Sequence, residues 1–191
     1  MAEMYTTEAL LRTMRDGFLE IGYREDLLQD NYGFADMFKE YHMFDQSKIG
    51  HSFSPFTIEV ERCKVHELAL AIGDDNPVYH SREAAQVAGY QDVPLSPTAP
   101  TIFSFWGNPH FLEQLTNIGI NVMRILHGEE SYEYLAAVYP GDTLSGVTTI
   151  TDGKTRRSKD GSMDIITLQT RYTNQDSQPV VNATTMFVVR E

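Results

Sequence analysis

The sequence contains very little cysteine and no long apolar run, and both absences narrow what the protein can be. Its single cysteine, Cys63, cannot form an internal disulfide, and nothing indicates an oxidising compartment. The N-terminus lacks a basic region followed by an apolar run, so no signal peptide is expected. No stretch approaches the roughly 18 apolar residues of a membrane-spanning helix. These absences predict a cytoplasmic protein that does not enter a membrane.

Basic residues are also scarce. The 191 residues include 15 Lys and Arg against 27 Asp and Glu, which gives a formal net charge of −12. Such an acidic chain is not expected to bind nucleic acid or an anionic membrane surface, because both repel negative charge. The six histidines are scattered and show no ligand spacing such as H-x-x-x-H. We therefore predict no metal ion and no other cofactor.

The order of the sequence patterns predicts one domain preceded by an extension. Residues 1–47 read as a helical extension rich in aromatic side chains. Residues 48–191 then read as a strand near 56–60, helices at 61–72 and 81–88, a buried helix from Thr101 and four strands, at 131–139, 143–151, 163–173 and 180–189. A hairpin loop is predicted over 152–161. Antiparallel strands that follow a central helix predict an α+β domain in which the sheet wraps around that helix.

The stretch richest in reactive side chains lies between the first two predicted helices, at residues 72–80. Its polar side chains are those of Asp74, Asp75, Asn76, Tyr79 and His80. Gly73 and Pro77 interrupt the helical pattern, so these groups are expected on a fixed loop at a helix end. Such a loop can carry acid–base chemistry, although the same residue types are ordinary in solvated turns.

The sequence G-D-D-N-P-V-Y at residues 73–79 resembles the motif G-D-x-N-P-x-H of the MaoC-like hot-dog proteins. These are the (R)-specific enoyl-thioester hydratases and 3-hydroxyacyl-thioester dehydratases. Further blocks resemble the family's N-terminal-type subgroup, which includes mycobacterial (3R)-hydroxyacyl dehydratase subunits; they lie at 56–61, 96–100, 126–129, 139–143 and 173–176. The resemblance covers residues 48–190. It implies a hot-dog fold, a second hot-dog subunit in a homo- or heterodimer, and an acyl-CoA or acyl-carrier thioester as substrate.

One position departs from the family motif. Asp74 falls on the family's catalytic aspartate, but Tyr79 occupies the position of the catalytic histidine, and His80 follows one residue later. In heteromeric members, one subunit keeps the Asp/His pair while the other lacks it and helps to bind the acyl chain. Tyr79 makes this chain resemble the second kind. The predicted function is (R)-specific hydration of 2-enoyl thioesters, or the reverse dehydration, with a partner that carries both residues.

Two alternatives stay open at the level of the sequence. The first is a self-sufficient homodimeric hydratase that uses Asp74 with His80 or Tyr79. The second is a non-catalytic protein that binds acyl thioesters. Adjacent side chains on a strand or tight turn point in different directions, so His80 is expected to point away from Asp74 if Tyr79 points toward it.

Hydration of an enoyl thioester needs a base, an acid and hydrogen-bond donors for the thioester oxygen. The candidate catalytic residues are Asp74, Tyr79 and His80. The candidate substrate-binding residues are Asn76, Ser96, Thr98, His127, Gly128, Arg156 and Arg157. The resemblance implies that backbone N–H groups near Thr98 hold the carbonyl oxygen. His127 could line an acyl tunnel, and the arginines could meet the phosphates of coenzyme A or an acidic carrier helix, or simply lie at a solvated hairpin tip.

Overall fold

A computed structural model describes residues 43–159 and 161–190, and the predicted extension over 1–47 lies almost wholly outside them. A five-stranded antiparallel sheet forms the body, with strand order β1-β3-β4-β5-β2. The strands are β1 (Phe56–Glu59), β2 (Ile125–Tyr134), β3 (Thr143–Ser158), β4 (Gly161–Thr173) and β5 (Pro179–Arg190). The α+β class is confirmed.

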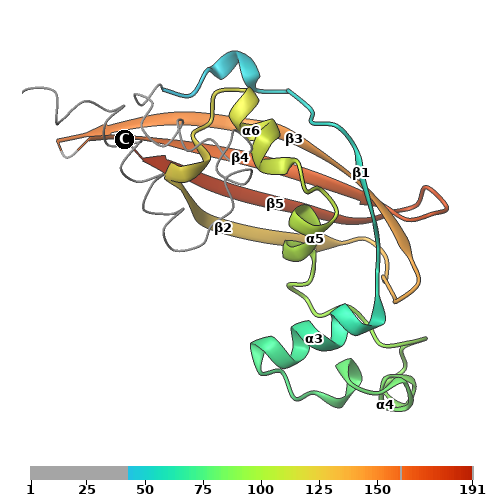
Figure 1. Cartoon of the computed structure of the whole chain (residues 1–191). Helices are drawn as coiled ribbons and strands as arrows, with labels where there is room; N and C mark the ends of the chain where they lie inside the picture. The colour runs from blue at the N-terminus through green and yellow to red at the C-terminus, as the bar shows by residue number, and fades with distance from the viewer. Residues whose placement is uncertain (1–42, 160, 191) are drawn as a thin grey trace, which may run out of the picture.

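The helices occupy two regions of the fold. The short helices α5 (Pro100–Trp106) and α6 (Phe111–Asn117) lie against one face of the sheet, whereas α3 (Arg62–Ile72) and α4 (Arg82–Val87) lie beyond one end of it (Figure 1). Single 3-10 turns are η3 (Gln46–Lys48), η4 (Pro77–Tyr79) and η5 (Val122–Arg124). The segment from α3 to α4 therefore projects from the end of the sheet where β1 leads into α3.

Local signals explain why α3 and α4 begin and end where they do. Gly73 ends α3 in the left-handed conformation, with φ 70° and ψ 26°, and its N–H donates to the carbonyls of the last helical turn. Ser81 precedes α4, and its hydroxyl accepts a hydrogen bond from the Ala84 N–H at 3.3 Å. Both predicted helices are confirmed, and the loop between them leaves α3 in a fixed direction.

The core lies between the sheet and the helices and comprises two clusters of buried side chains. The cluster nearest α3 is centred on Tyr172, whose ring makes edge-to-face contacts with Phe56 and Phe103, each with centroids 5.9 Å apart. The second cluster lies under α6 and is built around Phe111, Leu115, Ile150, Ile166, Leu168 and Phe187. The core thus holds α5 and α6 against the sheet. It also fixes which side chains of α5 point to each side of that helix.

Two features of the sheet and helices differ from the sequence prediction. The hairpin loop predicted over 152–161 is wrong, because β3 continues to Ser158 and pairs with β4 as far as Gly161. This extension carries polar and basic side chains, and such residues lack the apolar alternation by which a half-buried strand is recognised. The single central helix is instead two short helices, since Pro109 stops a continuous helix between them.

The strand predicted over 131–139 is shifted in the structure. β2 starts earlier, at Ile125, and ends at Tyr134. His127 and Gly128 therefore lie inside a strand that forms one edge of the sheet.

Candidate active site

The loop after α3, which we call the motif loop (residues 73–80), is shaped by its own side chains. The Asp74 carboxylate accepts a hydrogen bond from the Asn76 N–H at 3.0 Å. The Asn76 side chain accepts one from the Val78 N–H at 3.2 Å and so begins η4. Asn76 is exposed, and Asp74 is half-buried. Asn76 therefore fixes the turn, and one oxygen of Asp74 helps it to do so.

His80 contacts the main chain of Asp74 rather than its carboxylate. The His80 Nε2 lies 2.6 Å from the Asp74 carbonyl oxygen, and its Nδ1 lies 3.1 Å from Nδ1 of His66 on α3. A carbonyl oxygen only accepts hydrogen bonds, so Nε2 of His80 carries the proton and donates it. In the neutral ring, Nδ1 then accepts from His66. Both ring nitrogens of His80 are thus occupied, and neither faces the Asp74 carboxylate.

Tyr79 lies within the electrostatic reach of Asp74. Burial raises the pKa of the Tyr79 phenol above its usual value of 10, and the negative charge of Asp74 raises this pKa further, as does Tyr90. The phenol is therefore neutral near pH 7 and can only donate or accept a hydrogen bond there. The structure leaves the Asp74 carboxylate without an imidazole from its own motif, because both ring nitrogens of His80 bond elsewhere.

Tyr134 is a residue of this region that the sequence did not single out. Burial raises its pKa to about 12, and Tyr79 adds to the shift. Its hydroxyl donates to the Pro97 carbonyl oxygen at 3.1 Å, with the Ser96 carbonyl oxygen at 3.3 Å. Tyr134 thereby joins the end of β2 to the turn before α5. Only its position in a strand pattern is visible in the sequence, so no local signal could have identified this contact.

The turn before α5 contains two more of the predicted residues. Ser96 is 1% exposed, and its hydroxyl has no hydrogen-bond partner among the described residues. Thr98 is exposed, and its N–H has no acceptor in the part of the chain that the structure describes. The neighbouring Ala99 N–H is used, since it donates to the Ser96 carbonyl at 3.0 Å. Thr98 therefore offers the available backbone donor at this turn.

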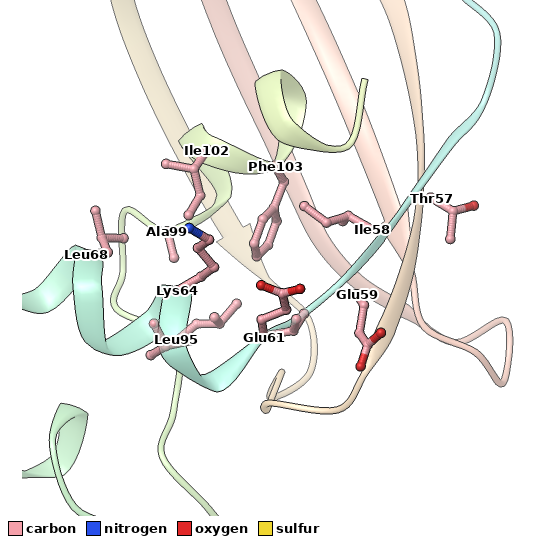
Figure 2. A pocket seen from close by; sticks show the side chains of 12 residues that line it. Thr57, Ile58, Glu59, Glu61, Lys64, Leu68, Leu95, Ala99, Ile102 and Phe103 are labelled. Carbon is pink, nitrogen blue, oxygen red and sulfur yellow. The ribbon is translucent and has the colours of Figure 1, made fainter. Parts of the chain in front are cut away.

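A mostly apolar cavity of about 290 Å³, which we call the apolar cavity, lies between β1, α3 and α5, and Thr57, Glu59, Glu61 and Lys64 also line it. Ile102 and Phe103 point from α5 into the space above α3, and the side chain of Lys64 extends from α3 toward α5 (Figure 2). The apolar walls are formed by Ile58, Val60, Val65, Leu68, Leu95, Ala99, Ile102 and Phe103. Its size is near the lower end of the roughly 300–1,000 Å³ range of small-molecule sites, so it can hold an apolar segment of a ligand.

Tyr79 and His80 border a larger, open hollow of about 630 Å³ on another side of α3. Its two arginines, Arg62 and Arg82, both face Asp92. Arg62 makes two hydrogen bonds of 2.7 Å to the Asp92 carboxylate, and these hold the pKa of that carboxyl well below its usual range. Since Asp92 already pairs with these positive charges, the hollow is not a strong anion site.

The remaining predicted residues lie along the sheet, away from the motif loop. His127 and Gly128 belong to β2. Arg156 and Arg157 are exposed near the far end of β3, because β1 and α3 adjoin Thr143 at the other end. At about 3.3 Å per residue, β3 advances roughly 40 Å from Thr143 to Arg156. The structure does not bring these arginines to the motif loop of the same chain.

The described residues contain neither a cluster of metal ligands nor a helix that could span a membrane. Among residues 43–159 and 161–190, no group of three or more His, Cys, Asp or Glu side chains is placed to hold a metal ion. Within the same ranges, no helix has the length and apolar character needed to cross a membrane.

Comparison with known proteins places the chain in a family. Residues 47–183 match the family described as the FAS1-like, dehydratase domain region. A UPF0336 protein of Saccharopolyspora erythraea is 32% identical over 147 residues, which cover 76% of this chain and 91% of that protein.

Solved structures support the same fold. The C-terminally truncated HadBC (3R-hydroxyacyl-ACP dehydratase) complex from Mycobacterium tuberculosis matches with a TM-score of 0.63 and 24% identity, over 74% of this chain and 96% of that chain. A MaoC-like dehydratase matches with a TM-score of 0.63 and 26% identity, over 75% of this chain and 42% of that one. The hot-dog fold is therefore confirmed, and the chain belongs to the FAS1-like dehydratase family of MaoC-like hot-dog proteins.

Proposed function

We propose that the chain is one subunit of an acyl-thioester hydratase or dehydratase. The enzyme would add water to 2-enoyl thioesters with R stereochemistry, or remove it from 3-hydroxyacyl thioesters carried by coenzyme A or an acyl carrier. Family membership supports the reaction class, because the family is described as a dehydratase domain and a similar solved structure is a 3R-hydroxyacyl-ACP dehydratase complex. The partner is a second hot-dog chain that carries both the Asp and the His of the motif.

The observation that carries this proposal is the position of the His80 ring. It bonds to the Asp74 main chain and to His66, so Asp74 lacks an imidazole from the motif. Tyr79 lies within the electrostatic reach of Asp74, and its raised pKa makes it a poor proton shuttle near neutral pH. We infer that the acid–base pair of the working site belongs to the partner, whereas Asp74 is the base only in the self-sufficient alternative.

This chain's contribution is binding of the acyl thioester. The apolar cavity between β1, α3 and α5 supports this role, because it can remove part of an acyl chain from water. Ala99 lines the cavity, and the preceding residue, Thr98, offers an unused N–H. A thioester carbonyl held at that N–H would place its acyl chain beside the cavity. The same donor would stabilise the developing negative charge on the oxygen.

The exposed edge of β2 is the proposed contact with the partner. Within the described residues β2 has one neighbouring strand, β5, so its other edge is open to pair with a second sheet. If two copies of this chain paired about Ser131, Glu129 of one copy would lie opposite Glu133 of the other. Like charges directly opposite destabilise a strand pair. In this register, the charge pattern favours a different hot-dog chain over a second copy.

The test is crotonyl-CoA hydration by this chain alone and after mixing with a hot-dog partner that has an intact D-x-N-P-x-H motif. The lone chain should show only background hydration, and the mixture should be active beyond the partner alone. Full activity of the lone chain would remove the partner requirement. Acyl-CoA binding without turnover in any mixture would instead support the binding-protein alternative.

Replacement of Tyr79 by Phe should leave the pH dependence of the mixed enzyme unchanged. The pKa of the phenol lies above its usual value of 10, so its ionisation cannot produce a limb in a rate profile measured below about pH 9. Activity should fall by less than about tenfold, because the substitution removes at most one hydrogen bond between neutral groups. Tyr90→Phe, at an exposed tyrosine nearby, is the control. Loss of a basic limb in Tyr79→Phe alone would show that the phenol does titrate in catalysis.

A further inference from the structure

A second cavity, of about 230 Å³, lies between the helices α5 and α6 and the sheet. Helix α5 lines both cavities: Ile102 and Phe103 face the apolar one, and Thr101 and Ser104 face this one. We call it the hydroxyl cavity because its walls include the hydroxyls of Thr101, Ser104, Thr148, Thr170 and Thr185. A plain alkyl chain in this cavity could not form hydrogen bonds with these hydroxyls, because it offers neither a donor nor an acceptor.

A β-bulge in β2 brings a histidine and a carboxylate together at this cavity. The ladder to β5 shifts between His127 and Glu129, which leaves Gly128 as the extra residue. Residues three apart on a regular strand point to opposite faces, but after this bulge His127 and Glu130 face the same side. The His127 Nε2 lies 2.8 Å from a Glu130 oxygen, and the Thr101 hydroxyl donates to the same carboxylate at 3.0 Å. The pair is thus a product of the bulge.

Two pairs of hydrogen-bonded hydroxyls each have one hydrogen to spare, and every member except Tyr172 lines the cavity. The Thr148 and Thr170 hydroxyls are 2.8 Å apart, and the Ser104 and Tyr172 hydroxyls are 3.2 Å apart. Each pair has two hydroxyl hydrogens, and the bond within the pair uses one of them. None of these four hydroxyls has another partner among the described residues. Thr148 and Thr170 are 3% and 4% exposed, so their spare donor has little access to bulk water.

We propose that the hydroxyl cavity binds a part of the substrate's acyl chain that carries a hydroxyl or carbonyl oxygen. This inference rests on the proposed function, since it assumes that an acyl thioester is the substrate. The substrate oxygen accepts the spare hydrogen of the Thr148 and Thr170 pair, since both of these residues line the cavity. A substrate hydroxyl can also donate to the His127 Nδ1, which is unprotonated when Nε2 donates to Glu130.

Size and polarity both favour part of an oxygen-bearing chain as the occupant. The volume is below the roughly 300–1,000 Å³ of sites that enclose a whole small molecule. An unsubstituted alkyl chain would displace water and leave the buried donors without acceptors, which is unfavourable. An acyl chain with an oxygen atom beside these donors avoids this cost. Its methylene groups can still pack against Phe111 and Phe187.

The experiment compares acyl-CoA thioesters that differ only in a terminal oxygen. Binding of hexanoyl-, octanoyl- and decanoyl-CoA and of their ω-hydroxy counterparts is measured by calorimetry, with the full chain and with its complex. At the chain length that reaches the cavity, the ω-hydroxy thioester should bind at least about tenfold more tightly, since a site built for hydrogen bonding disfavours a ligand that lacks the group. Thr148→Val and Thr170→Val, singly and together, should reduce this preference to less than about twofold. Thr148→Ser, which keeps the hydroxyl, should retain it.

Each other outcome overturns the inference in a distinguishable way. Equal binding of plain and hydroxylated chains by the unmodified protein would refute the oxygen-binding role and leave the proposed function standing. A preference that survives in the folded double valine variant would show that the oxygen binds elsewhere. If no thioester binds to the chain or to its complex, the proposed function fails together with the inference.

Discussion

Replacement of Tyr79 by His should give the lone chain a hydratase activity that it otherwise lacks. Tyr79 occupies the position of the motif histidine, and its phenol lies within the electrostatic reach of Asp74. An imidazole there would have a pKa near neutrality and could exchange protons with a water held by Asp74. General acid–base catalysis contributes roughly 10²–10⁴-fold, so crotonyl-CoA hydration by Tyr79→His should exceed that of the unmodified chain by about 100-fold or more.

Two further variants establish the source of any gain. Adding Asp74→Asn to Tyr79→His should return hydration to the level of the unmodified chain, because the new imidazole then lacks its carboxylate. Adding His80→Gln should preserve the gain, since the His80 ring faces the Asp74 main chain and His66. A folded Tyr79→His variant that binds crotonyl-CoA without hydrating it would contradict this prediction. It would show that the absence of the motif histidine is not the reason why the lone chain lacks hydratase activity.

Replacement of Gly146 by Ala should lower the free energy of unfolding by about 1–3 kcal/mol, the usual cost of excess volume in a packed core. A Cβ atom at Gly146 would lie 2.5 Å from the tip of the Phe56 ring, closer than side chains can approach. Phe56 is buried and packs edge-to-face on Tyr172, so its ring has little room to move. Urea denaturation, read by circular dichroism, measures the change.

The neighbouring residue and the facing ring supply the controls for this stability prediction. Val147→Ala changes a side chain that is 36% exposed on the same strand, and it should alter the unfolding free energy by no more than about 0.5 kcal/mol. Phe56→Leu combined with Gly146→Ala should cost less than the sum of the two single changes, because the smaller side chain makes room for the methyl group. Equal stability of Gly146→Ala and Val147→Ala would contradict the packing described for Phe56.

Local signals in the sequence were sufficient for the helices that frame the motif loop. Gly73, Pro77 and Ser81 each act on the backbone within a few residues, so the end of α3, the loop that follows it and the start of α4 could be predicted. The polar end of β3 could not, because Lys154, Arg156 and Arg157 read as a loop until β4 is seen to pair with them. Pairing with a distant strand supplies the backbone hydrogen bonds there, and no local pattern records it.

The parts of the site that depend on register were equally invisible. The bulge at Gly128 aligns His127 with Glu130, and it is defined only by how β2 pairs with β5. The contact between Tyr134 and Pro97 joins residues 37 positions apart. The ring of His80 meets His66 because α3 and η4 pack side by side, which the order of residues does not reveal. Tertiary packing thus decided which predicted groups face one another.

The most direct test of the central claim compares two matched Asp→Asn changes in the mixed enzyme. One alters Asp74 of this chain, and the other alters the aspartate of the partner's own D-x-N-P-x-H motif. Crotonyl-CoA hydration is then measured for both assemblies after their formation has been verified by size-exclusion chromatography. The partner's change should lower turnover by about 100-fold or more, whereas Asp74→Asn should retain most of it. Loss of turnover in Asp74→Asn with an active enzyme after the partner's change would contradict the account and assign catalysis to this chain.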